Sequence, residues 1–262
     1  PLYSSKWASE VSNNKKSYPQ FASIPIVKNE WTDVNGSKVW KDLEEITSDL
    51  SHIRFSGGEP LLDKTHSSML QYFINKQRSS YISLHYNTNA TIFASNLIPL
   101  WSRFKEVELS FSIDNTGKKF EYERYGVSWK TIVDTIEKYK KVTNTNFNLN
   151  VYSTITTLNI LDTYTLFQFC REYGLTISFN PLNNPKQLNI CLFNKKQKKY
   201  ISNKLLNIQD DEFQKIIEPI IKSMNSSNMS IDTTNMIDYL SITDKIRKQD
   251  YKQTYEELTY IL

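Results

Sequence analysis

Two adjacent glycines, Gly57 and Gly58, are followed directly by Glu59 and Pro60. The whole chain has only 6 glycines, so this pair is a marked local feature. Glycine lets backbone carbonyl groups come close to a ligand, and a carboxylate adds a charged hydrogen-bond acceptor. Such acceptors suit a cation with N–H donors, whereas a phosphate needs N–H donors at the start of a helix. The stretch therefore predicts a site for an ammonium group.

Small or polar side chains also follow four other segments that have the alternation of β-strands. They comprise Asn87 to Thr91, Ser112 to Asn115, Ser153 with Thr154, and Asn180 with Pro181. Ligands of parallel α/β folds bind at the carboxyl ends of strands. A hydroxyl with a carboxylate, as in Ser112 and Asp114, suits the hydroxyl groups of a ribose. Together these positions indicate a ligand that carries an amino group and a sugar.

The elements that must position these groups alternate strands with helices. Period-two alternation of apolar and polar residues predicts strands over 52–56, 81–87, 107–114, 147–155 and 175–180. Helical stretches lie between them, over 64–77, 94–104, 128–141 and 161–174. This alternation predicts βα units and a parallel sheet, in the α/β class.

One face of four predicted strands is polar. Its members are Ser83, His85 and Asn87; Glu108, Ser110, Ser112 and Asp114; Asn148, Asn150 and Tyr152; and Thr176, Ser178 and Asn180. Strands of an open parallel sheet read as continuous apolar runs, and a closed eight-stranded barrel is filled with apolar side chains. The polar faces instead predict a partial barrel whose interior holds solvent and a ligand. Half-exposed antiparallel strands are the alternative, and the intervening helices disfavour it because they fit parallel crossovers.

The pattern changes near residue 181. Residues 180–196 contain two prolines and predict a short strand pair, and helical patterns follow over 212–224 and 236–258. We therefore expect two domains, a partial β/α barrel over residues 1–180 and a mostly helical extension over residues 181–262.

Composition limits the classes of partner. The chain has 262 residues, 32 basic and 28 acidic side chains, and a formal net charge of +4. With so small an excess, the lysine run at 195–199 indicates a solvated face, and no nucleic-acid partner is expected. No apolar run has the length of a membrane span and no export signal is visible, so a cytoplasmic protein is expected. Cys170 and Cys191 lack metal-type spacing and are expected in the core.

Four motifs occur in the order SGGEPLL, NTNAT, LSFSID and the E-x-x-R-x-G-x-x-W of residues 121–129. In this order the chain resembles the radical S-adenosylmethionine (SAM) enzymes, in particular those with a twitch-type C-terminal subdomain. The resemblance covers nearly the whole chain and implies a partial (β/α)6 barrel that binds SAM as a cofactor. The residues it implies are Gly57, Gly58 and Glu59 at the amino group, Asn87 and Asn89 near the methionine or ribose, Ser112 and Asp114 near the ribose, and Arg124 near the carboxylate.

The resemblance also implies a 4Fe-4S cluster. The family holds it with three cysteines spaced C-x-x-x-C-x-x-C, which this sequence lacks, so no metal ligand is assigned within the chain. Residues 1–10 resemble the continuation of that loop, and the cysteines are expected upstream of Pro1. The C-terminal extension is expected to have no cluster of its own, because two cysteines fall short of four thiolates.

The implied reaction is reductive cleavage of SAM to methionine and a 5'-deoxyadenosyl radical, which abstracts a hydrogen atom from substrate. The implied partners are a small-molecule or peptide substrate and an electron donor such as a flavodoxin or ferredoxin. Two alternatives stay open. One is a cluster-less SAM-binding or scaffold protein on the same fold, and the other is a hydrolase that uses carboxylates such as Glu59 and Glu108. No catalytic residue is assigned.

Further polar side chains are expected to point into the barrel interior. His85 either contacts substrate and shuttles protons or is hydrogen-bonded within the structure. Arg54 and Glu108 either pair with each other or bind substrate. Tyr152 is a candidate substrate contact.

Overall fold

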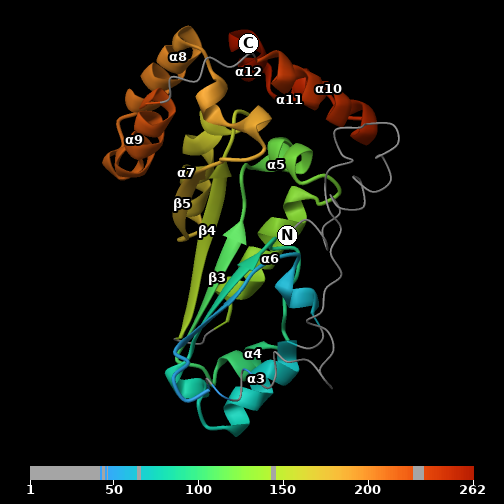
Figure 1. The fold of residues 1–262 in the computed structure, drawn as a ribbon, viewed down its shortest axis with the longest axis vertical. Helices are drawn as coiled ribbons and strands as arrows, with labels where there is room; N and C mark the ends of the chain where they lie inside the picture. Colours follow the sequence, from blue (N-terminus) through green and yellow to red (C-terminus); the bar gives the residue numbers. More distant parts are fainter. Residues whose placement is uncertain (1–41, 43–44, 46, 64–65, 143–145, 227–232) are drawn as a thin grey trace. The chain divides into compact units, whose positions relative to one another are not determined.

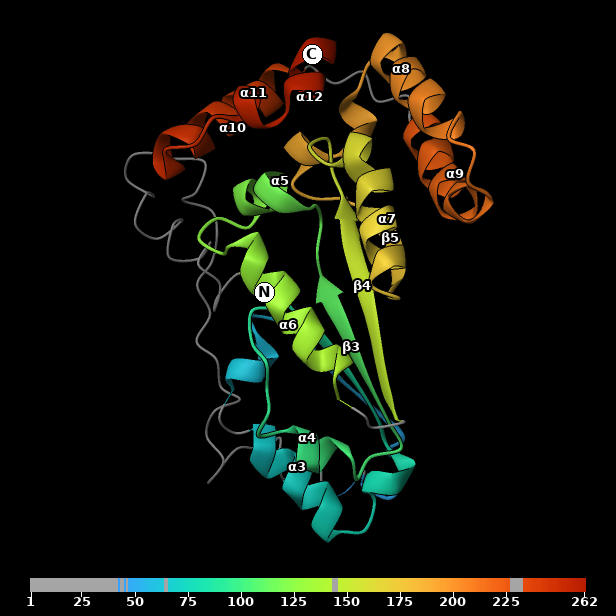
Figure 2. The same cartoon turned by 180° about the vertical axis from the view of Figure 1, so that it is seen from behind.

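The computed structural model describes residues 42, 45, 47–63, 66–142, 146–226 and 233–262. Strands and helices alternate along it until the chain becomes wholly helical (Figures 1 and 2). The strands are β1 (His52–Phe55), β2 (Ser83–Thr88), β3 (Glu106–Ser112), β4 (Phe147–Ile155) and β5 (Thr176–Pro181). The longer helices are α3 (His66–Asn75), α6 (Trp129–Lys140), α7 (Thr163–Glu172), α8 (Lys195–Leu206), α9 (Asp211–Ser226) and α10 (Thr234–Arg247). The shorter helices are α4 (Ile98–Trp101), α5 (Gly117–Glu123), α11 (Tyr251–Thr254) and α12 (Glu256–Ile261). The 3₁₀ turns of the described residues are η4 (Pro60–Leu62), η5 (Ser79–Tyr81), η6 (Ile160–Asp162), η7 (Lys186–Leu188) and η8 (Ile190–Leu192).

The five strands form one sheet in the order β1-β2-β3-β4-β5. The pairings of β1 with β2, of β2 with β3 and of β4 with β5 are parallel. Parallel neighbours need a crossover, and a helix follows each strand along the chain. The predicted α/β class and the mostly helical C-terminal part are therefore confirmed. Within the described residues there is no sixth strand of a (β/α)6 barrel.

The chain forms two compact units. Unit 1 comprises Pro1–Phe111 with Glu137–Leu149, and unit 2 comprises Ser112–Ile136 with Asn150–Leu262. Strands β1 and β2 and nearly all of β3 belong to unit 1, whereas β5 and most of β4 belong to unit 2. The predicted boundary after residue 180, between a barrel and a C-terminal extension, is a different division of the chain and stays a prediction.

The core of unit 1 lies against the apolar face of β2 and β3. The side chains that fill it are at most 1% exposed, and they comprise Leu84, Tyr86, Val107 and Leu109 from the strands and Leu70, Phe73 and Trp101 from α3 and α4. Helices α3 and α4 lie side by side (Figure 2). His85 and Asn87, on the other face of β2, stay partly exposed. The predicted split of this strand into an apolar and a polar face is confirmed.

His66 is part of this core. Its Nε2 lies 2.6 Å from the hydroxyl oxygen of Tyr86, which also accepts a hydrogen bond from Nε1 of Trp101 at 3.1 Å. Burial lowers the pKa of His66 to about 4. The imidazole is therefore neutral at physiological pH and has a structural role.

Unit 2 adds helices around β4 and β5. Helix α7 contacts β5, and α8 lies beside α9 (Figure 1). Helix α8 begins at a capping box, in which the side chains of Asn194 and Gln197 each accept a hydrogen bond from the other residue's backbone N–H. The lysine run at 195–199 lies on this helix and is not wholly solvated, because Lys198 is only 8% exposed.

The short strand pair predicted within residues 180–196 is wrong. These residues include the two 3₁₀ turns η7 and η8. Ile190 and Leu192 are buried and lie two residues apart, a spacing that also occurs in strands. The side chain of Asn189 accepts a hydrogen bond from the backbone N–H of Cys191 at 2.8 Å, and this contact favours a turn over an extended backbone.

Two helix predictions also need correction. The stretch 94–104 contains only the four residues of α4 as helix, and the seven-residue α5 was not predicted. A helix of that length is too short for an extended apolar stripe, although its Phe120 and Tyr122 are buried. None of the described helices is long and apolar enough to cross a membrane.

Candidate functional site

The loop after β1 requires both of its glycines. Gly57 has φ 92° and Gly58 has φ 54°, and both values lie in the left-handed region that L side chains rarely adopt. Two successive residues of this kind turn the chain sharply at the end of the strand. The turn delivers Glu59 to the N-cap of η4, where its Oε1 accepts a hydrogen bond from the backbone N–H of Leu61 at 3.2 Å.

Glu59 joins this loop to the end of β2. Its Oε1 also accepts a hydrogen bond from the hydroxyl of Thr88 at 2.8 Å, and its Oε2 accepts one from the backbone N–H of Asn89 at 2.7 Å. Burial raises the pKa of Glu59, although these hydrogen bonds oppose the shift. Among the described residues, no lysine or arginine forms an ion pair with this carboxylate. Because Oε2 accepts one hydrogen bond, it can accept another from a ligand.

The two predicted asparagines have different surroundings. The side-chain oxygen of Asn89 accepts hydrogen bonds from the backbone N–H and the hydroxyl of Thr91, which closes a turn after β2. The side-chain oxygen of Asn87 lies 3.0 Å from Nε2 of His85 and 3.4 Å from Nη2 of Arg54. Asn89 is therefore next to the Glu59 carboxylate through its backbone, whereas Asn87 belongs to the polar face of the strands.

In unit 2, Asp114 and Arg124 form an ion pair. The Oδ2 of Asp114 accepts from Nε of Arg124 at 3.1 Å and from its Nη2 at 2.5 Å, and the Oδ1 accepts from the backbone N–H of Thr154 at 2.8 Å. The side chain of Asp114 is 12% exposed, and it raises the pKa of Arg124. Ser112 ends β3 and is half-buried. Arg124, predicted for the carboxylate of a ligand, thus has a carboxylate partner within the protein.

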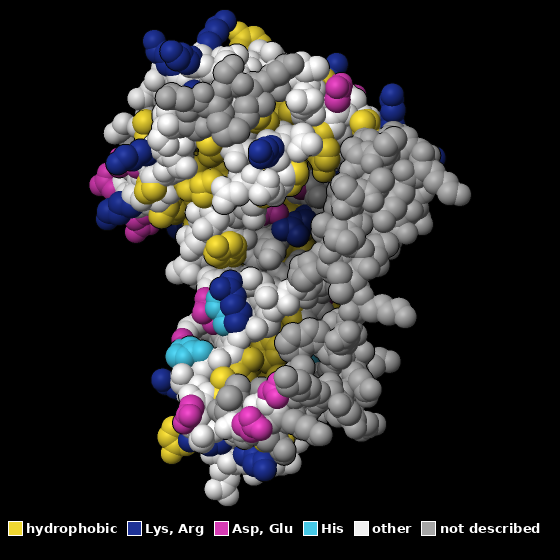
Figure 3. All heavy atoms as spheres, in the orientation of Figure 1, with side chains coloured by type: hydrophobic (Ala, Val, Ile, Leu, Met, Phe, Trp, Pro, Cys, Tyr) yellow, Lys and Arg dark blue, Asp and Glu magenta, His cyan; other side chains and the backbone are white. Residues whose placement is uncertain are grey.

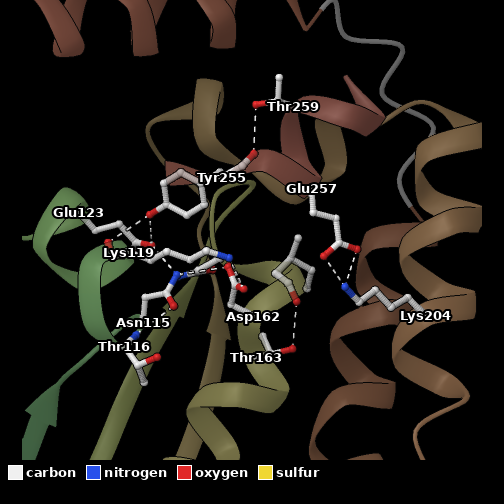
Figure 4. Close-up of polar contacts among 12 residues, drawn as sticks. Asn115, Thr116, Lys119, Glu123, Asp162, Thr163, Lys204, Tyr255, Glu257 and Thr259 are labelled. Carbon is white, nitrogen blue, oxygen red and sulfur yellow. Dashed lines mark hydrogen bonds and ion pairs between the residues drawn. The ribbon is translucent and has the colours of Figure 1, made fainter. Parts of the chain in front are cut away.

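A network of polar side chains surrounds the residue next to Arg124 (Figure 4). The Oε1 of Glu123 accepts hydrogen bonds from Nδ2 of Asn115 at 3.0 Å and from the hydroxyl of Tyr255 at 2.8 Å. Burial, with Asp114 nearby, raises the pKa of Glu123 to about 7. Sequence reasoning missed this network, because Tyr255 lies 132 residues from Glu123 and no local pattern links them.

A second pair in Figure 4 supports the same helix. Nζ of Lys119 lies 2.5 Å from Oδ1 of Asp162, and the backbone carbonyl of Lys119 accepts a hydrogen bond from the hydroxyl of Tyr255 at 3.2 Å. These contacts join α5 to Asp162 and to the C-terminal helices of unit 2. The position of Arg124, directly after α5, therefore depends on residues at the end of the chain.

Besides the surroundings of Glu59, unit 1 has a second polar region, the polar face of β1, β2 and β3 (Figure 3). Glu108 pairs with His85, whose Nδ1 lies 3.2 Å from its Oε2. The predicted pairing of Glu108 with Arg54 is therefore wrong. His85 is hydrogen-bonded within the structure, as one of its two predicted roles required. Tyr152, on β4 in unit 2, is 38% exposed, and its role as a substrate contact stays a prediction.

The cysteines have no metal-binding arrangement. Cys170 is 1% exposed, which confirms a core position, and burial raises the pKa of its thiol to about 12. Cys191 is half-buried, so the prediction of a core position for it is wrong. Within the part of the chain that the structure describes, no group of three histidine, cysteine or acidic side chains could hold a metal ion.

No family model and no curated protein matches the chain. Among solved structures, native anSMEcpe with bound AdoMet is 14% identical over 70% of this chain and 51% of that chain, with a TM-score of 0.48. Streptococcus suis SuiB bound to S-adenosylmethionine is 14% identical over 69% of this chain and 41% of that chain, with a TM-score of 0.45. The chain thus spans about half or less of the structures it matches, and these values assign no function to it.

Proposed function

We propose that the chain is the SAM-binding part of a radical SAM enzyme. The observation that carries the proposal is a group of hydrogen-bond acceptors in unit 1, namely the backbone carbonyl groups of Gly57 and Gly58 and the carboxylate of Glu59. We call this group the cradle. Its two glycines have the left-handed backbone that the motif needs, and its carboxylate is held by neutral donors without a cation. The order of the SGGEPLL, NTNAT and LSFSID motifs supports the same assignment.

The cradle suits the amino group of SAM. An ammonium group has three N–H donors, which fit the backbone carbonyl groups at the glycine pair and the remaining acceptor position of Glu59 Oε2. Its positive charge would stabilise the ionised form of Glu59, which burial now disfavours. Binding and ionisation are therefore coupled in this proposal.

The LSFSID motif contains the residues expected at the sugar, Ser112 and Asp114. Oδ1 of Asp114 accepts one hydrogen bond and retains acceptor capacity for a ribose hydroxyl, with Ser112 as a second polar group. Arg124 would act by fixing the charge and orientation of Asp114, and it would reach the SAM carboxylate only with the donors that Asp114 leaves unused. Asn87 and Asn89 would contact the methionine or ribose part.

In the intact enzyme, a 4Fe-4S cluster on cysteines outside this chain would supply the electron that cleaves SAM to methionine and a 5'-deoxyadenosyl radical. That radical would then take a hydrogen atom from the substrate. We include in this proposal a small-molecule or peptide substrate, a flavodoxin or ferredoxin as electron donor, and a cytoplasmic location. The twitch-like extension over residues 181–262 belongs to the same proposal.

A cluster-less SAM-binding protein is the alternative that the same cradle supports, because nothing in the cradle depends on iron. The hydrolase alternative fits less well. Glu59 accepts three hydrogen bonds, and Oε2 of Glu108 lies 3.2 Å from Nδ1 of His85, so both carboxylates already have partners within the protein.

Two experiments test these proposals in order. Calorimetric titration of the folded chain with SAM and with S-adenosylhomocysteine should show binding of both, and absence of binding would contradict every SAM-based alternative. The protein produced with its upstream residues is then reconstituted anaerobically with iron and sulfide and given SAM and a reductant. A cluster absorbance together with 5'-deoxyadenosine supports the enzyme, whereas SAM binding without either product supports the cluster-less protein.

A further inference from the structure

A cavity of about 350 Å³ lies over the polar face of β1, β2 and β3 in unit 1. Its polar lining comprises His52, Arg54, Ser83, His85, Glu106 and Glu108. Histidine side chains lie beside basic and acidic ones on this open face (Figure 3). The volume is near the lower end of the range for small-molecule sites.

Strand register orders these side chains by charge. Arg54, His85 and Glu108 are register partners on β1, β2 and β3, and so are His52, Ser83 and Glu106, two residues earlier on each strand. We call the side chains that one strand contributes to this face a column. The β1 column is therefore basic and the β3 column acidic, with uncharged and histidine side chains between. Neighbouring strands lie about 4.8 Å apart, so the outer columns are separated by about 10 Å at the backbone.

His85, in the β2 column, already has partners within the protein. Both ring nitrogens of His85 face acceptors, with Nδ1 at 3.2 Å from Glu108 and Nε2 at 3.0 Å from Asn87. Ser110 also lies 3.0 Å from Nε2, which forms a serine–histidine–glutamate series. Ser110 is only 1% exposed, however, and cannot present its hydroxyl to a substrate. The series is therefore not placed to act as a hydrolytic triad.

Arg54 is the side chain of this face that is available to a ligand. It is exposed, and among the described residues its side chain forms one long hydrogen bond, 3.4 Å to Asn87, and no ion pair. A guanidinium group presents a planar fork of donors that matches a carboxylate. A doubly charged anion would be repelled by Glu106 and Glu108 on the third strand, whereas an ammonium group would be attracted to them.

We propose that this cavity binds a small zwitterion of dipeptide size, with its carboxylate on Arg54 and its ammonium group toward Glu106 and Glu108. The ends of a dipeptide are about 7 Å apart when extended, which is compatible with the spacing of the outer columns. The assignment goes beyond the proposed function and does not depend on SAM.

Glycylglycine is the probe, and the histidine ring signals in nuclear magnetic resonance spectra of the full chain are the readout. The chain has 3 histidines. His52 and His85 line the cavity, and buried His66 is an internal control. We expect saturable shifts of the His52 and His85 signals and none for His66. N-acetylglycylglycine lacks the positive charge, glycylglycinamide lacks the negative charge, and inorganic phosphate has a second negative charge in place of the positive one. Each should bind about tenfold more weakly than glycylglycine.

Variants locate the site. Arg54→Gln and Glu108→Gln should each weaken glycylglycine binding about tenfold or more, while Arg103→Gln, a change of an exposed arginine in the same unit, should not. Equal binding by Arg54→Gln and Arg103→Gln would overturn the proposal. So would tighter binding of phosphate than of glycylglycine, or shifts that include His66. The titration contains no SAM, so its failure would leave the SAM assignment untouched.

Discussion

Two carboxylates follow strand ends, Glu59 in unit 1 and Asp114 in unit 2. They have the same kind of backbone contact but different side-chain partners. Each accepts a short hydrogen bond from a backbone N–H of another segment, 2.7 Å from Asn89 and 2.8 Å from Thr154. Asp114 then has the guanidinium of Arg124 as a partner. Glu59 has only neutral donors among the described residues, and burial raises its pKa.

The difference separates two kinds of ligand contact. A carboxylate that already has a cation gains little from an ammonium group and is suited to accepting hydroxyl groups. A buried carboxylate without a cation is costly when ionised, and a ligand that brings a positive charge relieves that cost. We therefore propose that Glu59 binds the amino group of SAM and that Asp114 binds the ribose.

The largest expected effect is on ligand affinity at Glu59. Glu59→Gln preserves size but removes the charge, and we expect SAM to bind about 100-fold more weakly, or about 2.7 kcal/mol. Calorimetric titration measures the change. Glu137→Gln, on the exposed side of α6 in the same unit, is the matched control. Equal affinities of the two variants would remove Glu59 from the site.

Asp114 should show its effect in stability instead. Arg124→Met leaves this largely buried carboxylate without its cation, and the free energy of unfolding should fall by about 2 kcal/mol. Chemical denaturation measures it, with Arg103→Met as the control. Adding Asp114→Asn to the Arg124→Met variant should restore part of the loss, because no unpaired charge is then buried. If the second change deepens the loss, the ion pair is not the cause.

Glu123, near Asp114 in unit 2, should make the free energy of unfolding depend on pH. Its pKa is raised from 4.5 to about 7 in the folded chain. Between those values the unfolded chain has released a proton that the folded chain retains, so the free energy of unfolding falls as pH rises. Glu123→Gln preserves the acceptor for Asn115 and Tyr255 but does not titrate.

We therefore expect the stability of Glu123→Gln relative to the unmodified chain to increase by about 1 to 2 kcal/mol from pH 4.5 to pH 8, allowing for partial exposure. Denaturation at a series of pH values measures it. Parallel stability profiles of the two proteins would show that Glu123 has an ordinary pKa.

The smallest effect concerns the glycine turn. Gly58 and Gly174 have similar positive φ values, 54° and 63°. Alanine at either position should cost about 1 kcal/mol of stability because of the backbone conformation. Only Gly58→Ala should also weaken SAM binding, by several-fold. Loss of SAM affinity in Gly174→Ala as well would indicate a general effect of stability rather than a local one.

The sequence was sufficient for the fold where one strand face alternates cleanly with the other. Leu84 and Tyr86 are buried and His85 is not, as period two requires. It also located the turn at Gly57 and Gly58, because few residues other than glycine adopt that backbone.

The partners of the polar side chains could not be predicted in the same way. The strand pattern put Arg54 and Glu108 on one face as a possible pair, but it did not indicate the contact of Glu108 with His85, which depends on side-chain geometry. The contact of Glu123 with Tyr255 depends on how the chain end packs, which no local periodicity encodes. Binding sites are built from such contacts, so the site was less predictable than the fold.

A double-mutant cycle between Glu59 and the amino group of the ligand tests whether these two groups bind each other. Calorimetry measures the affinities of S-adenosylhomocysteine and its analogue without the α-amino group, each for the unmodified chain and for Glu59→Gln. If Glu59 binds the amino group, the analogue binds both proteins almost equally and the two losses do not add. Fully additive losses would show that Glu59 does not bind the amino group.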